Sequence, residues 1–216
     1  MAPVTIPKEH EVAHHFDDLE QEFESHRLGM WLFLASEIMM FGALLVGGFI
    51  LMYRFPGAFA EGRAHLDWRL GALNTFFLIT SGFTMALAAL YSQRGDQAKL
   101  RGSLWLSLLF AAGFIVVKYF EYKAKFHHHT LPGNFFKASG FTDPHAHVFY
   151  GYYFTATGLH VLHVLIGMGL MIWCLLVSRK VKFTRAYITP VELSGLYWAL
   201  IDLVWFVLFP LLYLVG

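Results

Sequence analysis

Residues 148–178 read VFYGYYFTATGLHVLHVLIGMGLMIWCLLVS, a run without a single Asp, Glu, Lys or Arg. About 20 residues of helix cross the ~30 Å hydrocarbon layer of a bilayer. The run is far longer than the ~9–11 residues of a barrel strand and lacks alternating polarity. Because a backbone in lipid must satisfy its own hydrogen bonds, the run predicts a transmembrane helix.

Four further windows of this kind predict helices at about 28–53, 70–93, 102–122 and 191–215. The third window is uncharged only as far as Val117, and reaches full length if Lys118 snorkels to the interface. Only 14% of the chain is charged, whereas a soluble domain carries nearer a quarter. We therefore expect an all-α integral membrane protein, in which a polar tail at 1–27 precedes one five-helix domain at 28–216.

The distribution of basic residues predicts the orientation of these helices. The side that holds the N-terminal tail has nine Lys and Arg, against seven on the other side, and the short loop at 179–185 is densely basic. Because basic loops stay inside, we expect a cytoplasmic N-terminus and an outer C-terminus. The tail lacks the basic start and apolar centre of a signal peptide. The long loop at 126–147 then lies on the outer surface.

Two features of composition narrow the function. The formal net charge is +1, which indicates no nucleic-acid partner. The lone Cys174 can support neither a disulfide framework nor a thiolate metal site, and is expected to be a small buried hydrophobe.

Glu37 is the clearest ionisable residue inside a predicted helix. It lies nine residues past Leu28, about 13–14 Å along a helix axis, and so near the middle of the bilayer. A carboxylate there needs partners or takes up a proton. Glu37 is therefore either a proton-handling or lipid- or subunit-contacting group, or a protonated side chain bonded between helices of its own bundle.

Asp202 lies in the middle of the fifth window. At helical spacing it shares a face with Trp198, Trp205 and Phe209, and the two indole N–H groups could hydrogen-bond its carboxylate. This pattern favours a packed aromatic seam with an internal polar residue.

Two other acidic residues have ordinary explanations. Glu192 opens the fifth helix, where an acidic side chain interacts favourably with the helix dipole. Glu121 is spaced for an interfacial ion pair with Lys118 or Lys125.

His160 and His163 lie three residues apart on one predicted helix. Such spacing could offer two metal ligands, but bis-histidine haem ligation needs a histidine from a facing helix, and no other window provides one mid-membrane. No Cys or carboxylate set completes a zinc or copper site. We expect no haem or metal in this chain, and two histidines that hydrogen-bond to backbone or to neighbouring helices.

Five segments, in order along the chain, together resemble subunit III of the haem-copper oxidases, in its five-helix bacterial form. They are Trp31–Glu37 (WLFLASE), Leu73–Thr75 with Thr80–Gly82, Phe120–Tyr122 (FEY), Ala156–Val164 (ATGLHVLHV), and Glu192 with Tyr197–Trp198, Asp202 and Val204–Trp205. Two departures stand out. Ala199 replaces the histidine that often follows Tyr-Trp, and the two helices that open the seven-helix form are absent.

The resemblance implies a multi-pass subunit of a proton-pumping terminal oxidase in the bacterial inner membrane, working between cytochrome c and oxygen. Such a subunit carries no redox cofactor, because haem and copper reside in subunits I and II. It packs on subunit I, with subunit II and a small subunit as further partners, binds phospholipid and sustains proton uptake. Glu37 matches the family's mid-membrane carboxylate, and the matches in its helical core are His160, Glu192, Trp198 and Asp202.

Three alternatives remain open from the sequence. The chain could be subunit III of a quinol oxidase, or the related protein that accompanies nitric oxide reductase. It could be a small proton or solute transporter using Glu37 and Asp202, although it lacks repeated halves. It could also be a b-type cytochrome that uses His160 or His163.

Overall fold

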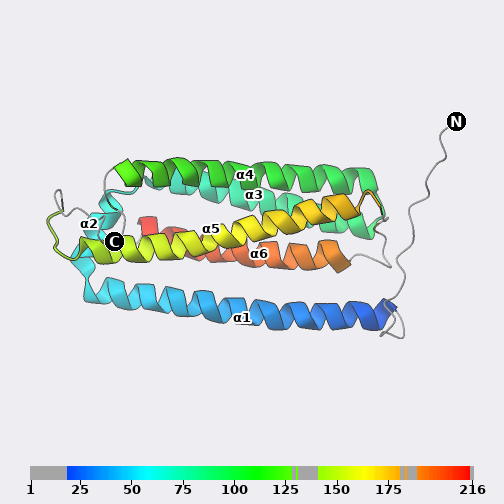
Figure 1. Ribbon diagram of the computed structural model, residues 1–216, viewed down its shortest axis with the longest axis horizontal. Coiled ribbons are helices and arrows are strands. Elements are labelled where there is room, and N and C mark those ends of the chain that lie inside the picture. The colour runs from blue at the N-terminus through cyan, green and yellow to red at the C-terminus, as the bar shows by residue number, and fades with distance from the viewer. Residues whose placement is uncertain (1–18, 128–129, 131–140, 181–182, 184–188, 215–216) are drawn as a thin grey trace.

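The protein is an antiparallel bundle of long helices (Figure 1). The computed structural model describes residues 19–127, 130, 141–180, 183 and 189–214, and these contain no strand. The elements are α1 (Leu19–Arg54), α2 (Pro56–Ala64), α3 (Trp68–Gln93), α4 (Gln97–His127), α5 (Ala146–Val177), α6 (Thr189–Phe209) and the π-helical turn η2 (Pro210–Leu214). Five helices in the described residues are long and apolar enough to cross a membrane. The all-α, five-helix prediction is confirmed.

Several helices extend beyond the apolar windows. Helix α1 begins at Leu19 rather than at the expected Leu28, and α4 runs from Gln97 to His127 rather than over 102–122. Hydropathy marks only the part of a helix that lies in hydrocarbon, whereas Glu, Gln and Lys favour helix outside it as well. The short helix α2 was not expected, and it begins with Pro56 in its first turn, a position that proline favours.

The helices pack both with their neighbours in the chain and with helices far along it. Helices α3 and α4 form an antiparallel pair, joined at Gly95, whose φ of 74° lies in the left-handed region that glycine adopts without strain. Helix α6 packs on α3 and α5, and α1 lies along α6 and α5 on the side away from α4 (Figure 1).

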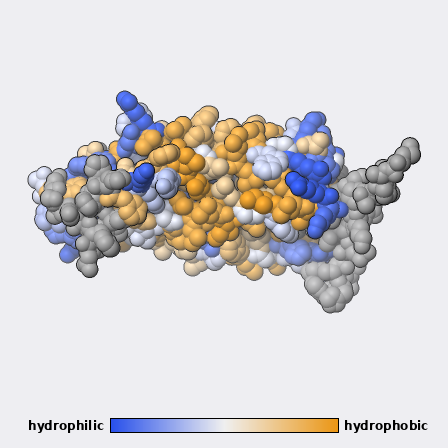
Figure 2. All heavy atoms as spheres, turned by 45° about the horizontal axis from the view of Figure 1, so that its top comes forward, coloured by the Kyte–Doolittle hydropathy of each residue, from blue (hydrophilic) through white to orange (hydrophobic). Residues whose placement is uncertain are grey.

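The surface of the bundle matches a membrane environment. Figure 2 shows a hydrophobic belt around the middle of the visible face, with hydrophilic residues toward both ends. Large apolar side chains point outward from this belt, among them Met39 at 76% exposed and Leu109 at 66%. Since such exposure is rare on a soluble monomer, the belt is where lipid or partner helices contact the bundle.

Lys118 does not snorkel, and the sequence-based expectation for it was wrong. Its side chain is 2% exposed, and its Nζ lies 2.9 Å from Glu121 Oε2 inside the bundle. The expected pair of Glu121 with Lys118 is therefore real but buried rather than interfacial. Helix α4 is long enough to span without snorkelling, because it continues as a helix as far as His127.

Candidate functional site

Glu37 and His163 form a polar pair between α1 and α5. Glu37 Oε2 lies 2.9 Å from His163 Nε2, and His163 Nδ1 lies 2.7 Å from the Leu159 carbonyl oxygen. Because a carbonyl oxygen only accepts, Nδ1 carries a hydrogen. Nε2 then either donates a second hydrogen to ionised Glu37, or accepts the hydrogen of a neutral Glu37. In both cases the pair has no net charge and holds one proton between two atoms.

The pair is largely enclosed by this chain's own helices. The side chains of Glu37 and His163 are 15% and 10% exposed, and the Phe41 ring meets the His163 ring edge-on at 5.0 Å. The Tyr197 hydroxyl donates to the His163 carbonyl at 3.3 Å. Of the two interpretations of Glu37, the structure shows the bond between helices of one bundle, and it leaves 15% of the Glu37 side chain exposed.

His160 differs from His163 although only three residues separate them. Its side chain is fully buried, and neither ring nitrogen has a hydrogen-bond partner in the described part of the chain. The ring lies between Phe114 and Trp205, at centroid distances of 5.6 Å and 5.1 Å. The expectation that both histidines would hydrogen-bond is confirmed for His163 and wrong for His160. Three residues place the two side chains about 60° apart around the helix, and the rings contact different neighbours: α1 for His163, and α4 and α6 for His160.

The indole groups do not satisfy Asp202, contrary to the sequence-based prediction. Trp205 Nε1 donates to Thr75 Oγ1 at 3.0 Å, which fixes α6 to α3. Trp198 Nε1 and Asp202 Oδ1 have no partner among the described residues. Asp202 lies against the α3 backbone at Gly82, where a Cβ atom would overlap its Oδ2.

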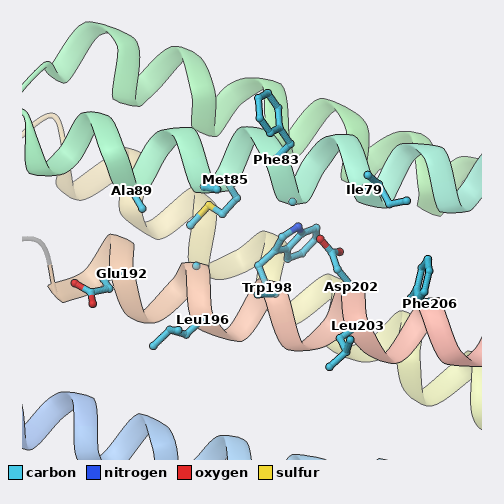
Figure 3. A pocket seen from close by; sticks show the side chains of 14 residues that line it. Ile79, Phe83, Met85, Ala89, Glu192, Leu196, Trp198, Asp202, Leu203 and Phe206 are labelled. Atoms are coloured by element: carbon cyan, nitrogen blue, oxygen red, sulfur yellow. The ribbon is translucent and has the colours of Figure 1, made fainter.

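A groove of about 540 Å³ runs along the surface of the bundle where α3 and α6 meet. Figure 3 shows Trp198 and Asp202 reaching from α6 toward α3, with Glu192 near one end of the groove. Three of the five candidate residues from the sequence therefore line one groove. Glu37 and His160 do not line it.

A buried hydrogen-bond network around Glu121 is a further polar feature of the bundle, and the sequence did not predict it. Glu121 Oε1 accepts hydrogen bonds from the hydroxyls of Tyr153, at 2.8 Å, and Tyr213. Lys118 Nζ donates to Tyr213 at 2.9 Å and lies 4.8 Å from the centre of the Trp205 ring. The network joins α4, α5 and η2. Only the spacing of Lys118 and Glu121 was visible in the sequence, since their partners lie far along the chain.

Glu61 of α2 anchors the described end of the long loop between α4 and α5. Its carboxylate accepts hydrogen bonds from the backbone N–H groups of Thr142 and Asp143, at 2.6 Å and 2.9 Å. These two bonds hold the pKa of Glu61 below its ordinary value. Residues 131–140 of the loop, which the sequence predicts on the outer surface, lie outside the described residues.

The described residues form no metal-binding cluster. Within the described ranges, no three His, Cys, Asp or Glu side chains gather closely enough to hold an ion. Cys174 is buried as expected, with its sulfur 3.4 Å from Ser194 Oγ.

Long apolar helices and buried polar pairs define a multi-pass α-helical membrane protein. Comparison with known protein families gives the family of this chain. The family model described as cytochrome c oxidase subunit III matches residues 12–216, and the chain therefore belongs to that family. The resemblance read from the five sequence segments is thereby confirmed.

Three relatives are similar over most of this chain. Subunit 3 of a cytochrome bo(3) ubiquinol oxidase from Pseudomonas putida is 30% identical, covering 88% of this chain and 85% of the relative. A probable cytochrome c oxidase subunit 3 from Nocardia farcinica is 29% identical, covering 87% of each chain. A heme-copper oxidase subunit I+III from Aeropyrum pernix is 30% identical, over 88% of this chain and 22% of the relative.

Proposed function

We propose that this chain is the accessory subunit III of a proton-pumping terminal oxidase in the bacterial inner membrane, with its N-terminus in the cytoplasm. The family match over residues 12–216 carries the proposal. Haem and copper then reside in partner subunits, and this chain stabilises the catalytic subunit. Its helices supply buried polar contacts and an apolar belt rather than a reaction centre.

The main partner in this proposal is subunit I. The Aeropyrum pernix relative, named as subunit I+III, carries both subunits in one chain, so they are neighbours in that protein. Subunit II and a small subunit complete the complex.

The electron donor in this proposal is cytochrome c, with quinol as the alternative. Relatives of both kinds are similar to this chain, since the Nocardia farcinica relative is named for cytochrome c and the Pseudomonas putida relative for ubiquinol. Other subunits bind the electron donor, so the subunit II that accompanies this chain decides between cytochrome c and quinol.

The Glu37–His163 pair has two roles in this proposal. It fastens α1 to α5, because the Glu37 carboxyl on α1 and the His163 imidazole on α5 hydrogen-bond to each other. It also places an uncharged, proton-holding pair at the lipid-facing side of the bundle, near the middle of the bilayer. Phospholipid would lie there, and proton uptake into subunit I would be sustained.

Purification of the native complex through a tag on this chain tests the proposal. We expect subunits I and II in equal amounts to this chain, and a copper-binding subunit II if cytochrome c is the donor. A subunit II without copper would select the quinol alternative. Recovery of the chain with no oxidase subunit would refute the proposal.

A further inference from the structure

Basic side chains gather at one end of the bundle, where α3 ends, α4 begins and α5 ends. Two short segments, 94–101 and 178–180, hold one acidic residue, Asp96, and five basic residues. These five form what we call the basic cluster: Arg94, Lys99, Arg101, Arg179 and Lys180. The two segments are in contact, because Arg101 Nε donates to Ser178 Oγ at 3.2 Å. The cluster is therefore built from residues about 80 positions apart in the chain.

The backbone that follows α5 is fixed against the first turns of α4. Gln97 on α4 pairs with the backbone of Phe183, since its Oε1 accepts from the Phe183 N–H at 3.3 Å and its Nε2 donates to the Phe183 carbonyl. The Arg101 guanidinium also donates to the Ser178 carbonyl. Positions 97 and 101 are about one turn apart on a helix, so Ser178 and Phe183 lie beside the same turn of α4. The basic residues just after Ser178 are thus held close to those of α4.

Three members of the basic cluster have no counter-ion in the described residues. The carboxylate of Asp96 is already used, because Oδ2 lies 3.0 Å from Lys99 Nζ and Oδ1 accepts from the Lys99 backbone N–H at 3.1 Å. Arg94, Arg179 and Lys180 are exposed, and none of them forms an ion pair within the described ranges. Their combined field is expected to attract an anion.

The other acidic side chains of this end lie on a different side of the bundle. Glu24 and Glu192 line one pocket at the junction of α1 and α6, together with Arg27. Helix α1 lies on the side away from α4 (Figure 1). The two signs of charge are therefore separated across this end of the described bundle, and the basic cluster faces outward from the α4 side.

The basic cluster lies where the hydrophobic belt ends. Arg94 directly follows the last residue of α3, and Arg179 lies two residues past the end of α5. Trp105, one turn after Arg101, and Leu176, three residues before Arg179, are 60% and 53% exposed. An exposed indole and exposed apolar side chains next to basic groups are typical of the border between acyl chains and headgroups. A lipid can contact both parts of this surface at once, whereas a soluble anion contacts only the charges.

We propose that the basic cluster binds the headgroup of an anionic phospholipid, phosphatidylglycerol or cardiolipin, in preference to a zwitterionic one. A phosphodiester is matched by Arg and Lys donors alone. A zwitterionic headgroup adds an ammonium group, for which the described part of the cluster offers no unpaired carboxylate. The inference rests on the proposed function for the membrane setting. It adds to that function a lipid class and a second lipid position, at one end of the bundle rather than at mid-membrane Glu37.

Native mass spectrometry of the purified complex, titrated with defined lipids in detergent, tests the proposal. The probes are phosphatidylglycerol, cardiolipin and phosphatidylethanolamine with the same acyl chains. We expect both anionic lipids to bind at least about tenfold more tightly than phosphatidylethanolamine. Arg94→Gln combined with Arg179→Gln and Lys180→Gln removes the three unpaired charges. Because one basic residue near an anionic headgroup contributes about fivefold to binding, this triple variant should lose most of the preference.

The matched control removes three exposed charges at the opposite end of the bundle. It combines Arg54→Gln, Arg69→Gln and Lys123→Gln, and it should keep the preference for anionic lipid. An equal loss in both triple variants would show that net charge alone attracts the lipid, and would overturn the inference. Equal binding of phosphatidylglycerol and phosphatidylethanolamine by the unsubstituted complex would overturn it as well.

Asp96→Asn changes the cluster in the opposite direction. The amide keeps a side-chain acceptor for the Lys99 N–H at the start of α4, but it removes the charge that pairs with Lys99 Nζ. This variant should bind phosphatidylglycerol about fivefold more tightly than the unsubstituted complex. Unchanged or weaker binding would contradict the role given to these charges.

Two further measurements separate a lipid from other anions. Inorganic phosphate, added at constant ionic strength, should not displace the lipid, and displacement would indicate a site for small anions instead. A preference shown by the isolated chain but lost in the complete complex would mean that an acidic segment of a partner subunit covers the cluster, and would also overturn the inference. If the chain co-purifies with no oxidase subunit, the proposed function fails, while the same titration of the isolated chain still decides the inference.

Discussion

The most demanding test of the fold is removal of one charge from the buried Lys118–Glu121 pair. Both side chains are less than 5% exposed, and Glu121 also accepts hydrogen bonds from Tyr153 and Tyr213. Lys118→Met would leave the Glu121 carboxylate buried without its cation. Breaking a buried pair in this way costs about 3–5 kcal/mol. For a chain of 216 residues, this corresponds to a fall in the unfolding temperature of roughly 6–20 °C.

Thermal unfolding in detergent, followed by tryptophan fluorescence or by loss of monodisperse protein, measures this fall. The double variant Lys118→Met with Glu121→Gln removes both charges and should recover a large part of the loss, because no lone charge remains. Lys123→Met is the control, since Lys123 is exposed on the same helix and its loss should cost within about 0.5 kcal/mol. A Lys118→Met variant as stable as the Lys123→Met control would refute the reasoning. So would a double variant whose loss equals the sum of the two single losses.

Three further outcomes follow from the structure. Glu37→Gln should leave assembly of the complex intact, since the amide keeps the shape and a hydrogen bond to the imidazole, whereas Glu37→Ala should weaken it; co-purification yields of the two variants measure the difference, and equal disruption would mean that the carboxyl itself is required. Gly82→Ala should destabilise the chain by about 1–3 kcal/mol, because its methyl group overlaps the Asp202 carboxyl, while Gly29→Ala, in open space, should not; thermal unfolding compares them. The lowered pKa of Glu61 means that its contribution to stability is present above its ordinary pKa and is lost as pH falls through the lower folded value. The protection factors of the 142–143 amides, measured by hydrogen exchange against the intrinsic rate at each pH, should therefore stay high at pH 7 and fall only in acid.

The helices themselves follow closely from the sequence, and the reason is physical. The uncharged window at 148–178 becomes α5 at Ala146–Val177, because hydrocarbon leaves the backbone no other way to satisfy its hydrogen bonds. The outer ends of the helices were harder to predict. The polar residues after Leu19 continue α1 in water, where neither hydropathy nor charge marks a boundary.

The partners of the polar residues could not be read from spacing alone. His160 and His163 look equivalent in the sequence, yet one packs between aromatic rings and the other meets Glu37, 126 residues earlier in the chain. Helical spacing suggests the indole N–H groups as partners of Asp202, yet the Trp205 indole donates to Thr75 on another helix. Such choices depend on how neighbouring helices rotate against one another, which single-helix periodicity does not determine.

Spectroscopy on the dissociated complex tests the central claim, that this chain is an accessory subunit whose redox centres lie in its partners. After this chain is stripped from the purified oxidase and the two fractions are separated, the reduced-minus-oxidised spectrum and the copper content of each are measured. The account predicts that all haem and copper stay with the remaining subunits, which keep their initial rate of oxygen reduction, and that the separated chain shows no Soret band. A stoichiometric Soret band or bound copper in the separated chain would contradict it.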